Sequence, residues 1–77
     1  MIMLMIKEDL KDYIKKLYGS QKACADALGV DRRTVYRWIN ENPKRMIKYV
    51  DAIVKTSDTT KIQIIGEILY HDEEING

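Results

Sequence analysis

The chain of 77 residues has one cysteine, one proline and one histidine, and these scarcities exclude several classes of protein. A single cysteine forms no internal disulfide and cannot supply a zinc site built from several cysteines. The sequence has no glycine-rich phosphate loop, no spaced set of metal ligands and no Ser-His-Asp arrangement. His71 lies beside Asp72 and Glu73, so we expect a solvated side chain rather than a metal ligand or a catalytic base. We therefore expect no enzyme activity, no cofactor and no small-molecule ligand.

Long apolar runs are lacking as well. The run Met1–Ile6 is too short to span a bilayer, and it has neither the basic start nor the small-residue cleavage site of a signal peptide. We expect a cytoplasmic protein with no membrane partner. The length and an apolar content of 45% predict one small domain over residues 1–77, with a core near the lower limit for independent stability.

Neither sign of charge is in clear excess, because the net charge is only +1. The distribution is nevertheless uneven. Residues 1–19 carry four basic side chains against three acidic ones, residues 20–48 carry seven against three, and residues 49–77 carry two against six. A basic surface opposite an acidic tail orients a protein on a polyanion, and the tail should limit non-specific affinity.

Residues 20–40 contain the most informative pattern of the chain, which is that of two short helices joined by a tight turn. Ser20 and Asp31 are candidate N-caps of the two helices. Gly29 lies where the chain leaves the first helix and must adopt a positive φ. The pattern predicts a helix-turn-helix, which places its second helix in the DNA major groove.

The second helix has two faces when successive residues are turned by about 100°. One face is apolar and contains Val35, Trp38 and Ile39. The opposite face contains no carboxylate and consists of Arg32, Arg33, Tyr36, Arg37 and Asn40. Arginine reads guanine and asparagine can read adenine, so we expect Arg32, Arg33, Tyr36 and Arg37 to face bases. The alternative is an ordinary solvated face, which usually mixes charges of both signs.

Residues flanking this helix are expected to contact the DNA backbone. Gln21 and Lys22 begin the first helix of the motif, where free N–H groups favour a phosphate. Lys44 and Arg45 follow the second helix, although a solvated turn is nearly as plausible there. Asn40 would lie at the edge of the contact.

The motif resembles the helix-turn-helix signature of the phage Cro and repressor family. The resemblance rests on the spacing of Gln21, Ala25, Gly29, Val30, Val35 and Trp38, and lambda Cro-like segments occur at Leu10–Tyr13, Tyr18–Gln21 and Leu28–Val30. It covers roughly residues 8–40 and ends after Asn40. It implies a dimeric transcriptional repressor that binds operator DNA in a bacterium or a phage-infected cell. The resemblance also implies that Gln21 and Lys22 hold the DNA backbone and that the outward residues of the second helix face bases or flanking phosphates.

The rest of the chain predicts an all-α, helix-turn-helix domain of about five short helices. We expect a helix over residues 7–18 with lysines on its far face, and a fourth helix over residues 43–55 that starts at Pro43. Residues 61–70 are ambiguous, because β-branched residues and partial alternation also fit a strand. The alternative is therefore an α+β, Cro-like fold in which residues 1–6 and 61–70 form a small sheet. As a helix, the isoleucines and Leu69 of this stretch would share one broad apolar face.

Apolar segments at both ends predict a homodimer. Residues 1–6 and 61–75 offer more apolar surface than three short helices can cover, unless both fold into the monomer core. A twofold dimer would place two recognition helices about 34 Å apart on palindromic double-stranded DNA. Two other functions stay open, namely a DNA-binding subunit of a packaging or recombination complex, similar to a small terminase, and a protein-interaction module on the same fold.

Overall fold

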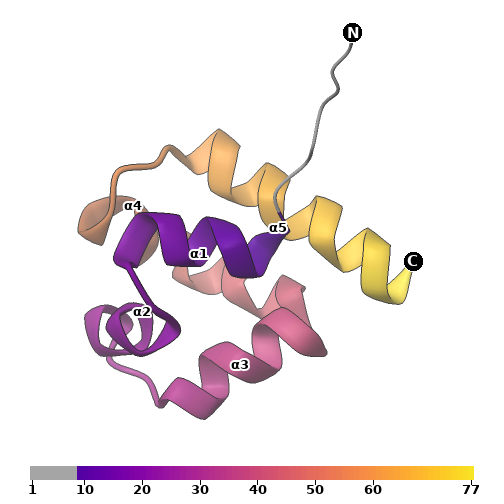
Figure 1. Cartoon of the computed structure of the whole chain (residues 1–77). Coiled ribbons are helices and arrows are strands. Elements are labelled where there is room, and N and C mark those ends of the chain that lie inside the picture. Colours follow the sequence, from indigo (N-terminus) through magenta and orange to yellow (C-terminus); the bar gives the residue numbers. More distant parts are fainter. Residues whose placement is uncertain (1–8) are drawn as a thin grey trace, which may run out of the picture.

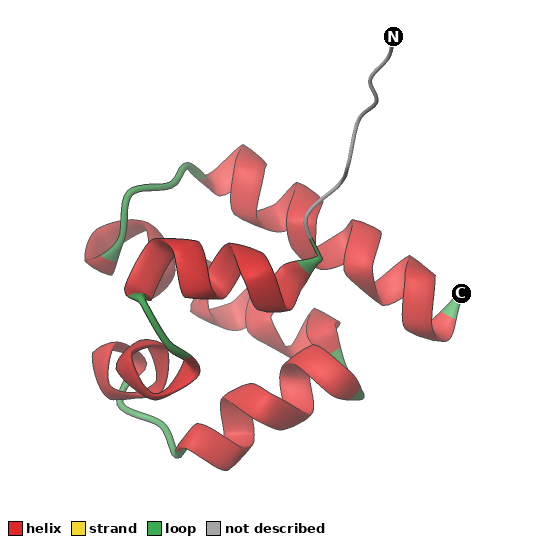
Figure 2. Cartoon of the chain, in the orientation of Figure 1, coloured by secondary structure: helices red, strands yellow, loops and turns green. Residues whose placement is uncertain are grey.

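The computed structural model describes residues 9–77, and within this range the chain contains helices and no strand (Figure 2). The elements are α1 (Leu10–Tyr18), α2 (Gln21–Leu28), α3 (Arg32–Asn40), a 3-10 helix η1 (Pro43–Tyr49), α4 (Val50–Thr56) and α5 (Lys61–Asn76). The prediction of an all-α fold with about five helices is confirmed. The α+β alternative is wrong for residues 61–70, which lie within α5, and residues 1–6 lie outside the described range.

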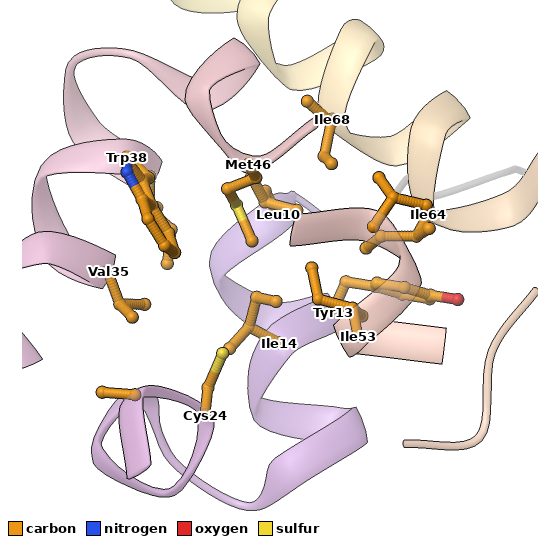
Figure 3. Packing of buried hydrophobic residues seen from close by; sticks show 13 residues of the cluster. Leu10, Tyr13, Ile14, Cys24, Val35, Trp38, Met46, Ile53, Ile64 and Ile68 are labelled. Carbon is orange, nitrogen blue, oxygen red and sulfur yellow. The ribbon is translucent and has the colours of Figure 1, made fainter. Parts of the chain in front are cut away.

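The helices surround one core to which every element contributes (Figure 3). In Figure 1, α2 and α3 lie on one side of the molecule, α5 runs along the other, and α1 crosses between them. The largest fully buried aliphatic side chains are Leu10, Ile14, Met46, Ile53, Ile64 and Ile68. Figure 3 shows Trp38 and Val35 of α3 approaching Met46 from one side and Ile64 and Ile68 of α5 from the other. The core therefore ties α3 to elements that follow it in the chain.

Local capping signals set the helix boundaries. The Ser20 hydroxyl accepts a hydrogen bond from the Ala23 N–H at 3.0 Å, and the Asp31 carboxylate accepts one from the Arg33 N–H at 3.3 Å. Gly29 has a φ of 72°, which confirms the predicted left-handed turn after α2. Asp9 caps α1, so this helix begins at Leu10, whereas residues 7 and 8 of the predicted helix lie outside the described range.

The predicted single helix over residues 43–55 is wrong, because it is divided into η1 and α4. The backbone of Tyr49, with φ −102° and ψ 6°, leaves the α-helical region between the two. Pro43 and Met46 are buried and Tyr49 is partly buried, so the inward positions of η1 recur every three residues. That interval matches the 3.0 residues per turn of a 3-10 helix and keeps all three side chains on the core side.

The structure also corrects the expectation that His71 is solvated. Its side chain is 8% exposed, its Nε2–H donates to the Ile39 carbonyl at 2.7 Å, and its Nδ1 accepts from the Leu10 N–H at 3.5 Å. The acidic neighbours in sequence misled the prediction. In α5 His71 follows Ile64 and Ile68 at spacings of seven and three residues, so it shares their inward face.

The apolar residues of α5 lie on two faces rather than on one broad face. Ile64 and Ile68 are fully buried, whereas Ile62 is 86% exposed and Leu69 is 46% exposed. Two residues apart means about 200° of rotation in a helix, so Ile62 and Ile64 must point in opposite directions. We call Ile62, Ile65 and Leu69 the outer stripe of α5.

Candidate nucleic-acid interface

The helix-turn-helix is held together by small and apolar side chains between α2 and α3. Cys24 and Ala25 are 0% and 1% exposed, and Val35 of α3 is 0% exposed. Small residues on α2 let the two helices approach closely. The Val30 N–H donates to the Ala25 carbonyl at 3.0 Å, which fixes the turn that leads into α3. These contacts determine the direction in which α3 presents its outer side.

The outer side of α3 carries the residues that the sequence placed there. Val35, Trp38 and Ile39 are buried, and the Trp38 ring packs against that of Tyr49 with centroids 4.9 Å apart and planes tilted by 40°. The opposite side is exposed throughout, and we call it the outward face: Arg32, Arg33, Tyr36, Arg37 and Asn40. Within residues 9–77 none of its three arginines forms an ion pair. Their guanidinium groups are therefore available to a ligand.

Asn40 differs from the other four residues of the outward face. Its side-chain amide donates a hydrogen bond of 2.9 Å to the Tyr36 carbonyl in the preceding turn. This bond turns the amide nitrogen back onto its own helix. Asn40 is the last residue of α3, and its amide nitrogen already has a hydrogen-bond partner.

Gln21 and Lys22 lie at the start of α2, where Gln21 is half-buried and Lys22 is exposed. The Lys22 Nζ lies 3.2 Å from the Asp26 Oδ2, one turn further along the same helix. Both side chains of this pair are about two-thirds exposed, and such surface pairs contribute little free energy. A phosphate could therefore replace Asp26 as the partner of Lys22 at small cost.

An open hollow of about 670 Å³ lies where α1, α2 and α3 meet, and we call it the first hollow. It is lined by Lys11, Lys15, Gly19, Ser20, Gln21, Lys22, Arg32, Arg33 and Tyr36. It brings together five of the predicted contact residues. It also includes Lys11 and Lys15 of α1, which were not among the predicted contact residues. The two lysines are four residues apart and so lie on one side of α1, and this spacing could have identified them from the sequence.

A second hollow of about 430 Å³ lies on the opposite flank of α3. It is lined by Thr34, Arg37, Trp38, Glu41, Asn42 and Arg45. The α3 positions that line the two hollows are separated by roughly 150° of helical rotation, so the hollows flank the helix. Arg37 and Arg45 meet in the second hollow beside one carboxylate, that of Glu41.

Lys44 does not line the second hollow with its neighbour Arg45. Its Nζ lies 3.7 Å from the Asp72 Oδ2 of α5. The predicted pair of backbone contacts is thus divided, since Arg45 lies beside α3 and Lys44 is directed to α5.

Other reactive groups do not add to this surface. Burial raises the pKa of the Cys24 thiol to about 11, so at neutral pH the thiol is protonated and unreactive. Among the residues that the structure describes, no three His, Cys, Asp or Glu side chains are grouped so as to hold a metal ion. None of the helices in this range is both long and apolar enough to cross a membrane.

Comparisons with protein-family models, with curated proteins and with solved structures gave no match.

Proposed function

We propose that this chain is a sequence-specific double-stranded DNA-binding regulator that reads its operator through the major groove with α3. The observation that carries the proposal is the outward face of α3, where Tyr36 and three arginines that form no ion pair within residues 9–77 are exposed beside two hollows with cationic side chains. An α-helix fits the major groove, which is about 12 Å wide. A helix in that groove has a sugar-phosphate strand on each side, and the two hollows flank α3 in the same manner.

Each part of the surface has a separate task. Arg32, Arg33 and Arg37 would donate to base edges, for which the bidentate pairing of arginine with guanine O6 and N7 is the commonest contact. Tyr36, which is 57% exposed, would contact a thymine methyl or a phosphate. Lys22 and Arg45 would bind phosphates, which supply affinity and register but no sequence information.

The resemblance to the Cro and repressor family favours repression as the outcome of this binding. A bound protein occupies the operator, so a promoter that overlaps the selected sequence should lose transcription in a reporter cell. Increased transcription would indicate an activator instead of a repressor, and it would not contradict DNA binding.

We further propose a homodimer that forms through the outer stripe of α5. Ile62, Ile65 and Leu69 recur at helical spacing, and two of them are well exposed. Sedimentation should show a dimer for the native chain and a monomer for Ile62→Lys or Leu69→Lys. Ile75→Lys is the matched control, because Ile75 is exposed in α5 but lies outside the outer stripe. A monomeric native chain would contradict the proposal.

The test of the function is selection of bound duplexes from a random pool at near-physiological salt. We expect a palindromic motif, and we expect Arg33→Gln and Arg37→Gln to change or abolish it. Lys55→Gln is the control, because Lys55 is an exposed cation of α4 that lines neither hollow. A single half-site would retain specific DNA binding without the dimer. No enrichment by a folded protein would overturn the proposal, and it would favour a non-specific DNA-packaging factor or a protein-interaction module.

A further inference from the structure

The first hollow has a charge pattern that an ordinary protein surface does not have. Among residues 9–77, its lining includes five cationic side chains and no carboxylate. Lys11 and Lys15 enter it from α1, and both are exposed. Neither forms an ion pair with another residue of the described range. The concentration of one sign in a concave site raises the local potential and attracts an anion.

Stabilisation of α1 itself does not explain both lysines. A cation in the last turn of a helix is favoured by the helix dipole, and this accounts for Lys15. Lys11 lies in the first turn, where the same dipole disfavours a positive charge. The Asp9 carboxylate caps the helix by accepting from the Asp12 N–H at 3.0 Å, and it forms no ion pair with Lys11. Neither the dipole of α1 nor an ion pair within residues 9–77 therefore accounts for the position of Lys11.

The hollow is continuous with the outward face of α3, because Arg32, Arg33 and Tyr36 belong to both. An anion in the hollow would thus lie beside the helix proposed to enter the major groove. Lys11 and Lys15 are about 6 Å apart along α1, while phosphates of one DNA strand recur about every 3.4 Å along the duplex axis. One strand that follows the groove can therefore reach both lysines.

We propose that one DNA backbone strand crosses the first hollow and that Lys11 and Lys15 of α1 bind its phosphates. This inference rests on the proposed function. It extends the interface from the helix-turn-helix to the helix that precedes it. The ligand chemistry is a phosphodiester strand, and the contacts carry no sequence information.

The first experiment measures the salt dependence of binding to the selected duplex and to a random duplex. Lys11→Gln and Lys15→Gln should each reduce the slope of log K against log salt by about 0.9, and the double variant by about 1.8. At about 0.1 M salt each single change should weaken binding roughly eightfold on both duplexes. Lys55→Gln is the matched control, because it removes the same charge from an exposed helical lysine that lines neither hollow.

Equal effects of Lys55→Gln would show that only net charge matters and would overturn the inference. An unchanged slope for Lys11→Gln and Lys15→Gln would also overturn it. If native protein binds its selected duplex normally in that experiment, the proposed function survives. If native protein binds no DNA at all, both fail together.

A second measurement detects the contact without any substitution. Lysines of the native protein are acetylated with and without the duplex, and the modified positions are identified by mass spectrometry. DNA should protect Lys11 and Lys15, and it should leave Lys55 and Lys61 reactive. Inorganic phosphate at the same charge concentration should give no protection. Protection by phosphate alone, or equal reactivity of Lys11 and Lys15 with and without DNA, would contradict the inference.

Discussion

His71 is the buried polar residue whose removal tests the fold most directly. It joins three helices, since its ring in α5 binds the Ile39 carbonyl in α3 and the Leu10 N–H in α1. Both groups lie at helix ends, where the backbone has no intrahelical partner. Phenylalanine at position 71 would keep an aromatic ring and remove both hydrogen bonds.

The magnitude follows from the two distances. Loss of the 2.7 Å bond leaves a buried carbonyl without a partner, which costs about 1–3 kcal/mol. The 3.5 Å contact is at the limit of a hydrogen bond and should add less than about 1 kcal/mol. The more apolar phenylalanine ring recovers part of this, so we expect a net loss of about 2 kcal/mol. A domain of this size has only about 4–12 kcal/mol of stability, so the effect should be large.

The assay is urea denaturation followed by circular dichroism, which gives the free energy of unfolding for each variant. His71→Gln is the matched control, because a glutamine amide can still donate to the Ile39 carbonyl. We expect His71→Gln to be more stable than His71→Phe by about 1 kcal/mol, despite its less apolar side chain. A His71→Phe variant as stable as the native protein would refute the role of these hydrogen bonds.

Three further predictions concern the core, the outward face and the buried thiol. Trp38→Ala should cost about 3–5 kcal/mol and nearly unfold the protein, because Trp38 is 4% exposed and its ring packs against Tyr49. An unchanged thermal melt would contradict this packing. Arg33→Ala should weaken binding to the selected duplex by about 1–3 kcal/mol in fluorescence anisotropy, and an equal loss on random DNA would make Arg33 a phosphate contact. Burial raises the pKa of Cys24 to about 11, so the unfolded thiol loses its proton first and stability should fall as pH rises from 9.0 towards 11. Denaturation midpoints across this range should show that decline, and it should be smaller in Cys24→Ala.

Features encoded by neighbouring residues were predictable from the sequence. The caps at Ser20 and Asp31 and the left-handed Gly29 depend on atoms within three or four positions. The division of α3 into an apolar side and the outward face follows from helical rotation alone. These local signals are sufficient to locate the helix-turn-helix and the residues that it exposes.

Features that depend on distant contacts were not predictable in the same way. The expectation for His71 was drawn from its acidic neighbours, whereas its environment is formed by Leu10 and Ile39, 61 and 32 positions away. The 3-10 winding of η1 reflects its packing against the core. The role proposed for Lys11 depends on the approach of α1 to the start of α3, which no local pattern specifies.

The hydrogen bond from His71 to Ile39 has a consequence for folding during synthesis and for transfer of the motif to another protein. During synthesis α3 leaves the ribosome before α5, so the carboxyl end of α3 lacks its hydrogen bond to His71 until α5 follows. The Asn76 amide adds to this late closure by donating to the Glu41 carbonyl at 3.1 Å. A graft of residues 20–40 onto another scaffold would transfer the arginines without the groups that hold the carboxyl end of their helix. Variants made to test the proposed DNA binding should therefore retain α5 together with the motif.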